Sequence, residues 1–279
     1  MDGRLCSKGC RNPFLKGLEI KVITNKQVKE LVTWNRKSKA RKEDGVFLVE
    51  GSKMFLEAPN ERIRNIYVSE SFFATDECRK KMELLGYEVV PEDTFKKISD
   101  TMTPQGILCV MGRMEYTMDE LLKKENPTLM VLEDLQDPGN LGTIMRTGEG
   151  AGIDGVILSK GCVDIYNPKT IRSTMGSLYR VPFIYVDSLS DTILQLKKRG
   201  IHFYAAHLKG TKFYDEFDFT KDGGTAFLIG NEGNGLKDET ADLADSYLKI
   251  PMEGKVESLN AAIAASILMY EVYRQKRRK

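Results

Sequence analysis

The chain has 279 residues, of which 41% are hydrophobic and 29% are charged, and this composition excludes a protein that is disordered throughout. Its formal net charge is only +2, which taken alone argues against a protein that binds nucleic acid. The charge is unevenly distributed, because residues 1–42 hold 12 basic and 3 acidic side chains and residues 274–279 hold five more basic ones. A basic beginning and end on an acidic body indicate contact with a polyanion such as RNA.

Several classes of protein are disfavoured by what the sequence lacks. No apolar run approaches the roughly 18–20 residues of a membrane span, and no apolar signal core follows Met1, so a cytoplasmic protein is expected. The five cysteines are scattered, and only His202 and His207 are available to complete a metal site. We therefore expect reduced thiols and no metal. Zinc hydrolysis and serine–histidine–aspartate chemistry are disfavoured for the same lack of histidines.

The first part of the chain predicts a basic region. Residues 1–20 lack periodicity, which predicts a flexible basic arm. A helix is expected next, because Val28, Leu31, Val32 and Trp34 have the spacing of one helical face. Basic side chains surround this helix, and contact with RNA competes there with the simpler interpretation of a solvated surface. The basic candidates are Lys29, Arg36, Lys37, Lys39, Arg41 and Lys42.

Short strands and helices then alternate as far as residue 112. Strands are expected at 46–49, 66–68, 87–90 and 107–111, and helices at 52–58 and 72–85. This pattern predicts a small α/β domain over 21–112. The charged stretch 113–127 is poor in strand-forming residues and is expected to be a linker.

A second α/β series follows over 128–279. Strands are expected at 129–132, 156–158, 182–186, 202–206, 225–229 and 247–250, and helices at 140–149, 189–199, 236–244 and from Ser258 into the basic tail. Strands separated by helices predict a mostly parallel sheet, with ligands at the carboxyl ends of its strands.

One glycine pattern in this series suggests a nicotinamide enzyme but has the wrong context. Gly150, Gly152 and Gly155 match G-x-G-x-x-G, a motif that needs a strand before it and a helix after it. Here a predicted helix precedes the glycines and a predicted strand follows them. We therefore interpret them as the left-handed end of a helix.

Three loops after predicted strands carry most of the polar side chains that could do chemistry. In the first, Asn140 stands at an expected helix N-cap, and Arg146 could either form a surface salt bridge or reach the mouth of the sheet. In the second, three glycines frame Glu232, and glycines let the backbone approach a ligand closely. In the third, Pro251 ends a strand and Ser258 is the expected N-cap of the final helix. All three loops should meet at one edge of the sheet, where a pocket is expected.

These loops closely resemble the three motifs of the SpoU (TrmH) family of RNA 2′-O-ribose methyltransferases, in the SPOUT superfamily. The order and spacing of the motifs agree over about 130 residues. The matching segments are Asp137-Pro-x-Asn140 with Gly142 and Arg146, then Gly230-Asn-Glu232-Gly-x-Gly235, then Ile250-Pro-Met252 with Ser258-Leu-Asn260. In the N-terminal domain, Phe47-Leu-Val-Glu50-Gly51 and Thr103-Pro-Gln-Gly106 are similar to the substrate-binding domain of that family.

The resemblance implies a specific fold and site. The segment 128–279 would be a SPOUT domain with a trefoil knot, preceded by a smaller, ribosomal-protein-like α/β domain that binds RNA. The enzyme would be a homodimer with its active site near the interface. S-adenosylmethionine would be held, largely through backbone, by Gly230, Ile250, Met252 and Leu259. The polar site residues would be Asn140, Arg146, Glu232, Ser258 and Asn260.

The expected reaction is methyl transfer to a ribose hydroxyl. An arginine is protonated essentially always, so we interpret Arg146 as stabilising the developing alkoxide rather than removing a proton. By analogy, 23S ribosomal RNA is favoured over transfer RNA as the substrate. The alternatives are a transfer RNA ribose methyltransferase, a ribosomal RNA enzyme that confers antibiotic resistance, or a non-catalytic RNA-binding protein of the same fold.

Overall fold

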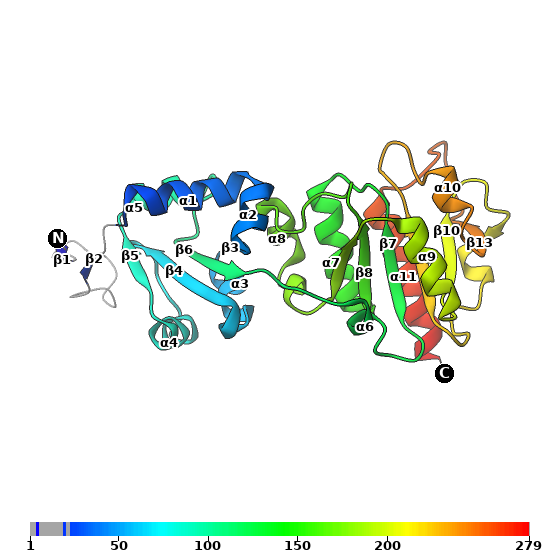
Figure 1. Cartoon of the computed structure of the whole chain (residues 1–279), viewed down its shortest axis with the longest axis horizontal. Coiled ribbons are helices and arrows are strands. Elements are labelled where there is room, and N and C mark those ends of the chain that lie inside the picture. The colour runs from blue at the N-terminus through cyan, green and yellow to red at the C-terminus, as the bar shows by residue number, and fades with distance from the viewer. Residues whose placement is uncertain (1–3, 6–18, 21–22, 279) are drawn as a thin grey trace. The chain divides into compact units, whose positions relative to one another are not determined.

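Two β-sheets organise the chain, one in each of two units (Figure 1). The computed structural model describes residues 4–5, 19–20 and 23–278. Unit 1 comprises Met1–Met114 and Tyr166–Tyr179, and unit 2 comprises Glu115–Ile165 and Arg180–Lys279. The expected arm 1–20 therefore lies almost entirely outside the described residues.

Unit 1 has a six-stranded mixed sheet in the order β1-β2-β5-β4-β6-β3. Its strands are β1 (Arg4–Leu5), β2 (Glu19–Ile20), β3 (Val46–Glu50), β4 (Ile63–Ser69), β5 (Glu88–Val90) and β6 (Ile107–Gly112). The helices α1, α2 and α5 lie on one face of the sheet and α3 and α4 on the other (Figure 1). Their bounds are α1 (Asn25–Arg36), α2 (Ser38–Asp44), α3 (Ser52–Glu57), α4 (Asp76–Leu85) and α5 (Glu92–Ile98).

Alternating side chains of β3 and β6 are buried on both faces of the sheet. Leu48 and Leu108 pack with Leu31 of α1 and Phe95 of α5 in one core cluster. The residue next to Leu48, Phe47, points to the opposite face and is fully buried as well. Side chains buried on both faces explain why β3 and β6 have continuous apolar sequences.

The segment 166–179 comes from the middle of the C-terminal series but is counted in unit 1, which the expected division at 113–127 did not anticipate. It contains α8 (Pro168–Thr174) and a 3-10 turn at Ser177–Tyr179, and neither was predicted. The ring of Tyr166 lies 4.7 Å from that of Phe47, and the Tyr166 hydroxyl donates to the Met114 carbonyl (2.9 Å). The Tyr179 hydroxyl donates to the Met54 carbonyl (3.1 Å).

Unit 2 has a seven-stranded sheet in the order β11-β13-β10-β12-β7-β8-β9, and every strand pair in it is parallel. Its strands are β7 (Thr128–Leu132), β8 (Gly155–Ser159), β9 (Phe183–Val186), β10 (His202–Ala206), β11 (Lys212–Phe213), β12 (Thr225–Ile229) and β13 (Ser246–Lys249). The two central strands, β7 and β12, are buried along their whole length. The prediction of a parallel α/β sheet is confirmed.

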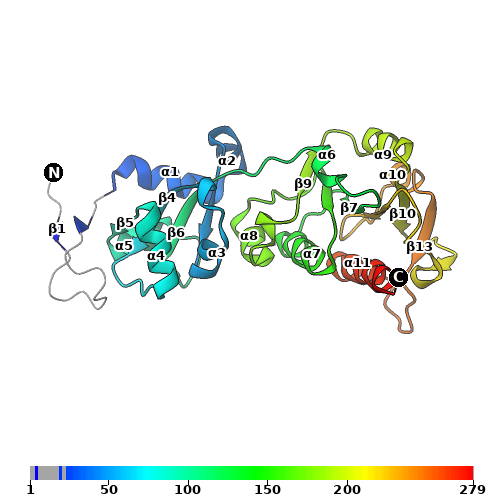
Figure 2. The same cartoon turned by 90° about the horizontal axis from the view of Figure 1, so that it is seen from below.

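Helices cover both faces of this sheet (Figure 2). They are α6 (Met118–Leu121), α7 (Pro138–Ala151), α9 (Leu189–Lys198), α10 (Asp238–Ala241) and α11 (Ala261–Arg277). The helices α7 and α11 lie side by side on one face, and α9, α10 and α6 contribute to the core on the other. Leu121 of α6 is fully buried in that core, so the stretch expected to be a linker also carries a core residue.

Helix ends differ from expectation in two places that matter for the site. The N-cap of α7 is Asp137, whose side chain accepts from Asn140 N–H, so Asn140 is not the cap. The N-cap of α11 is Asn260, and Ser258 lies outside the helix. The left-handed cap expected from the glycine pattern is confirmed, since Gly152 ends α7 with φ +71°. Within the described part of the chain, no helix is both long and apolar enough to cross a membrane.

Candidate active site

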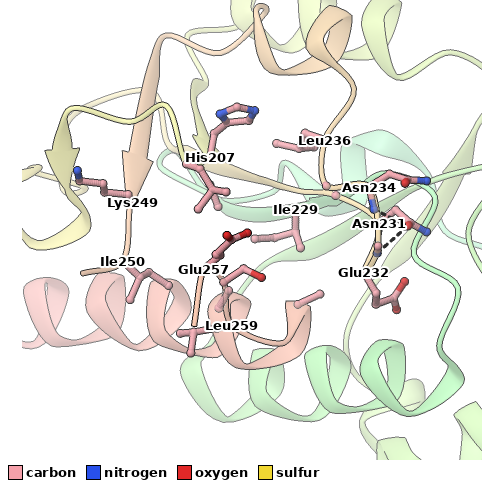
Figure 3. Close-up of a pocket in the computed structure, with 18 of the residues that line it drawn as sticks. His207, Ile229, Asn231, Glu232, Asn234, Leu236, Lys249, Ile250, Glu257 and Leu259 are labelled. Carbon is pink, nitrogen blue, oxygen red and sulfur yellow. Dashed lines mark hydrogen bonds between the residues drawn. The ribbon is translucent and has the colours of Figure 1, made fainter. Parts of the chain in front are cut away.

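A pocket of about 360 Å³ lies where β10, β12 and β13 end, as expected for a parallel sheet. The residues that line it fall within the segments 206–208, 229–236, 248–252 and 257–264 (Figure 3). All four residues expected to hold a cofactor are among them, namely Gly230, Ile250, Met252 and Leu259. Apolar side chains such as Ile229 and Leu236 share the lining with exposed backbone of the glycine-rich loop.

The glycine-rich loop after β12 folds back on itself so tightly that Gly230 cannot carry a side chain. Asn231 and Gly235 exchange two backbone hydrogen bonds of 3.0 and 2.9 Å. A Cβ atom on Gly230 would lie 2.1 Å from the carbonyl carbon of Gly235 and 2.2 Å from the nitrogen of Leu236. Gly235 has φ +69°, a conformation that favours glycine. The Asn231 side chain donates to the Asp134 carbonyl (2.8 Å) and ties this loop to the one after β7.

Glu232 is the hub that joins two of the three loops. Its carboxylate accepts from the backbone N–H groups of Gln136 (3.1 Å) and Asp137 (2.9 Å) and from the Asn140 side-chain amide (2.9 Å). Burial acts to raise the pKa of Glu232, but the hydrogen bonds from Asn140, Gln136 and Asp137 outweigh it and lower the pKa. The carboxylate is therefore ionised at neutral pH and holds the start of α7.

Asn260 extends this network to the third loop. Its side-chain amide donates to the Asn140 side-chain oxygen (2.9 Å), and its own oxygen accepts from Ala262 N–H (2.9 Å) at the start of α11. Glu232, Asn140 and Asn260 therefore form one chain of hydrogen bonds across segments that are far apart in sequence. Such a network fixes the loops relative to one another.

The remaining two candidates occupy different places. Ser258 lines the pocket. Arg146 lies on α7, is exposed, and is not among the residues that line the pocket. Within the described part of the chain its side chain makes no hydrogen bond or ion pair. Glu232 therefore holds the loop before α7 and does not bond to Arg146. The structure thus connects four of the five polar candidates to the pocket or its network and leaves the fifth apart.

Sequence reasoning missed several polar residues of the pocket, among them His207, Lys249 and Glu257. The His207 ring lies 5.0 Å from that of Tyr247, and its Nδ1 accepts from Lys209 N–H (3.1 Å). The Lys249 ammonium lies 5.2 Å from the ring centre of Phe213. Their positions could have indicated this role, because His207 and Lys249 stand at or next to the ends of predicted strands, where the pocket was expected.

The basic residues proposed to contact RNA do not share one environment. Arg41 is buried, only 3% exposed, and its guanidinium donates to the carbonyls of Trp34 (2.6 Å) and Asn35 (3.3 Å). The prediction that Arg41 contacts RNA is therefore wrong, because its charge is used to join α1 and α2. The other candidates are exposed, and they are Lys29, Arg36, Lys37, Lys39 and Lys42.

Part of the basic tail is likewise structural. Arg274 pairs with the buried Glu271 (2.5 Å), and this interaction, led by a side-chain hydrogen bond, lowers the pKa of Glu271. Lys276 donates to the hydroxyl of Thr128 (2.8 Å), the first residue of β7. Only Arg277 and Arg278, among the described tail residues, have exposed cationic groups without such contacts.

The described residues offer no group of three or more side chains that could hold a metal ion. Cys78, Cys109 and Cys162 are buried free thiols. Cys6 and Cys10 lie outside the described residues.

Comparisons with known proteins agree across both units. Residues 127–270 match the profile of the SpoU rRNA Methylase family, and residues 25–109 match the MRM3-like substrate binding domain. A relative from Bacillus subtilis (strain 168), named 23S rRNA (guanosine(2553)-2'-O)-methyltransferase RlmP, is 32% identical over 257 residues. The match covers 91% of this chain and 98% of the relative.

Two solved structures are similar to nearly the whole chain. The SpoU methyltransferase AviRb from Streptomyces viridochromogenes, in complex with AdoMet, has a TM-score of 0.82 and 26% identity, covering 91% of this chain and 99% of that one. The AdoMet-bound rRNA methyltransferase from Sinorhizobium meliloti has a TM-score of 0.78 and 28% identity, covering 91% and 97%.

Proposed function

Because the chain belongs to the SpoU rRNA Methylase family and is an S-adenosylmethionine-dependent RNA 2′-O-ribose methyltransferase, we propose that its substrate is a ribose of 23S ribosomal RNA. The relative from Bacillus subtilis, which matches both units, is named for that RNA and supports the proposal. Action on ribosomal RNA would place the protein in the cytoplasm.

The pocket fits the cofactor. Its volume of about 360 Å³ is in the range of small-ligand sites. Ile229, Leu236, Ile250 and Leu259 offer apolar surface for an adenine ring, and the tight loop at Gly230 leaves backbone groups accessible. Bound S-adenosylmethionine supplies a methyl group on a positively charged sulfur. We propose that Gly230, Ile250, Met252 and Leu259 hold it.

The hydrogen-bonded network of Glu232, Asn140 and Asn260 is the observation that carries the catalytic proposal. It joins the cofactor loop to the start of α7, the helix that carries Arg146. We propose that the network positions both, and that Ser258 orients the ribose from the rim of the pocket. Arg146 stabilises the developing alkoxide with its permanently charged guanidinium, and the hydroxyl proton leaves to phosphate or water.

A homodimer would explain the position of Arg146. Arg146 is exposed and outside the pocket lining of its own chain, so a second copy offers it a partner site. The neighbouring helix α11 exposes Ile263 (49%), Tyr270 (48%) and Tyr273 (41%), which are large apolar groups for a surface helix. We propose that α7 and α11 form the dimer interface. The trefoil knot stays a prediction from the resemblance and is part of this proposal.

Unit 1 is the proposed RNA-binding domain. Its exposed basic residues Lys29, Arg36, Lys37, Lys39 and Lys42 support this role, because phosphate contacts by lysine and arginine dominate affinity for RNA. The match of residues 25–109 to a substrate binding domain supports it as well. Looped RNA is a better target than duplex, because a base-paired ribose is difficult to enclose.

The decisive experiment maps 2′-O-methylation in total RNA from cells with and without the gene. Loss of one methyl group in 23S ribosomal RNA, restored by the wild-type gene, is the expected result. Loss from a transfer RNA would instead favour the transfer RNA enzyme. An unchanged methylation map, together with no heat of S-adenosylmethionine binding in calorimetry, would favour a non-catalytic RNA-binding protein.

A further inference from the structure

Two carboxylates line the cofactor pocket, and only one of them accepts hydrogen bonds from other described residues of the protein. Glu232 accepts hydrogen bonds from Gln136, Asp137 and Asn140, as described above. Glu257 stands in the loop between β13 and α11, and its carboxylate is directed into the space enclosed by the lining residues (Figure 3). Among the residues that the structure describes, it makes no hydrogen bond and no ion pair.

The basic group on the same pocket does not neutralise Glu257. Lys249 also lines the pocket, but its ammonium lies over the ring of Phe213, 5.2 Å from the ring centre. Glu257 therefore contributes to the pocket lining a carboxylate that pairs with no other described side chain. A charge held on a pocket wall with no protein partner favours a ligand of opposite sign.

The reaction changes the charge of the ligand by one unit. The bond between sulfur and the methyl carbon breaks, a bond between that carbon and the ribose oxygen forms, and the hydroxyl proton is lost to phosphate or water. The electron pair stays on sulfur, so a sulfonium becomes a neutral thioether. The cofactor carries a sulfonium, an ammonium and a carboxylate, a net +1, whereas the product S-adenosylhomocysteine has a net charge of zero.

We propose that Glu257 is a specificity-determining residue that favours the charged cofactor over its neutral product. The inference rests on the proposed binding of S-adenosylmethionine in this pocket. Attraction to Glu257 favours the net positive ligand before transfer and is weaker for the neutral product after it, so the residue would limit inhibition by the product. Glu257 does not take part in the chemical step.

The test compares three ligands on the full-length wild-type protein and on Glu257→Gln, which keeps the shape and removes the charge. The ligands are S-adenosylmethionine, S-adenosylhomocysteine and sinefungin, an analogue with an amine in place of the methylated sulfonium. Calorimetry should show Kd for S-adenosylmethionine and sinefungin rising roughly three- to five-fold, the effect of one partly solvated charge pair, while Kd for S-adenosylhomocysteine changes by less than about two-fold. The difference should shrink at high salt.

Two further variants separate charge from structure. Glu253→Gln makes the same charge change in the same loop, but Glu253 does not line the pocket, so all three affinities should stay at wild-type values. Glu257→Asp keeps the charge and should largely restore the preference. If Glu257→Gln weakens the binding of all three ligands equally, or changes none of the three affinities, the inference about Glu257 is overturned. The proposal that the pocket binds S-adenosylmethionine would still stand. Failure of the wild-type protein to bind S-adenosylmethionine would overturn the proposed function itself.

Discussion

At the scale of single residues, the site separates groups that position loops from groups that face a ligand. Glu232 and Asn260 direct their polar atoms at backbone N–H groups and at Asn140, so their first role is to hold α7 and α11 in place. Ser258 and Glu257 line the pocket as Glu232 does, but among the described residues their side chains make no such hydrogen bonds. Substitutions of the loop-positioning residues should therefore lower both stability and function, whereas substitutions of the ligand-facing residues should affect function alone.

Glu232→Gln should lower both stability and cofactor affinity. Glutamine places an N–H₂ group where the carboxylate accepted three hydrogen bonds, which should cost about 1 kcal/mol after allowance for its exposure to solvent. Since folding lowers the pKa of Glu232 from 4.5, its contribution is present at neutral pH and is lost as the pH falls through the depressed folded value. Thermal unfolding of wild type and variant should therefore differ at neutral pH and converge in acid. A difference that persists in acid would contradict the assigned ionised state.

Arg146→Lys should abolish most methylation and leave cofactor binding unchanged. Lysine keeps the positive charge but loses the planar fork of donors that an alkoxide and a phosphate could share. We expect the single-turnover methylation rate to fall about 100- to 1,000-fold, as for the loss of one preorganised donor. Because Arg146 does not line the pocket, Kd for S-adenosylmethionine serves as the control. A near-normal rate would argue against a specific role for the guanidinium.

At the scale of elements, strands were easier to predict than helix ends. Both central strands, β7 and β12, are continuous apolar runs because both of their faces are buried, and their positions agree with the sequence prediction. The start of a helix depends on which of several neighbouring residues with capping side chains occupies the N-cap position. Asp137, followed by proline at the first helical position, caps α7 in preference to Asn140, and Asn260 caps α11 in preference to Ser258.

The site was predictable where it consists of loops after strands and not where it depends on contacts between loops. The pocket-lining residues Gly230 and Leu259 follow from motif position. The hydrogen bond between Asn140 and Asn260 joins residues 120 positions apart, and no local pattern indicates it. The burial of Arg41 could not be predicted from the sequence either. An arginine that donates to backbone carbonyls and one that binds phosphate look the same in a run of basic residues.

Gly230→Ala should disrupt the cofactor loop as a whole. The added methyl group would meet backbone atoms at 2.1–2.3 Å, which cannot be relieved by moving a side chain. The turn between Asn231 and Gly235 would have to open, and affinity for S-adenosylmethionine should fall more than about ten-fold, as preorganisation of the loop is lost. Gly254→Ala is the matched control, because nothing lies within 4 Å of its Cβ position. Equal affinities in the two variants would show that the tight turn is not needed for binding.

At the scale of the whole molecule, oligomeric state is the first property to test. Tyr270→Asp combined with Tyr273→Asp would place two charges on the exposed face of α11. We expect the mass from light scattering to fall to that of one chain and methylation to be lost, because a charge is not tolerated in a buried interface. Leu194→Asp on α9, another exposed apolar residue (46%), should change neither. A wild-type protein that is already monomeric and active would refute the dimer.

RNA binding by unit 1 should depend on salt through its exposed basic residues. Lys29→Glu with Lys37→Glu should weaken RNA binding and reduce the slope of log Kd against log salt by about 1.4 if both contact single-stranded phosphates. Affinity for S-adenosylmethionine should be unaffected. Lys198→Glu at the end of α9 is the control for an unspecific effect of charge. If the slope of log Kd against log salt is unchanged in the double variant, Lys29 and Lys37 do not contact RNA phosphates and other residues must do so.

Residues 166–179 belong to unit 1 although the residues on both sides of them belong to unit 2, and this affects how chimeras of related proteins can be built. The chain crosses between the units at 114–115, 165–166 and 179–180, so neither unit is one uninterrupted stretch. Tyr166 and Tyr179 are core residues of unit 1, although they are encoded within the methyltransferase sequence. A gene fusion joined anywhere in 113–127 would pair one parent's substrate domain with another parent's α8. The substrate domain can therefore be exchanged intact between relatives only if α8 is exchanged with it.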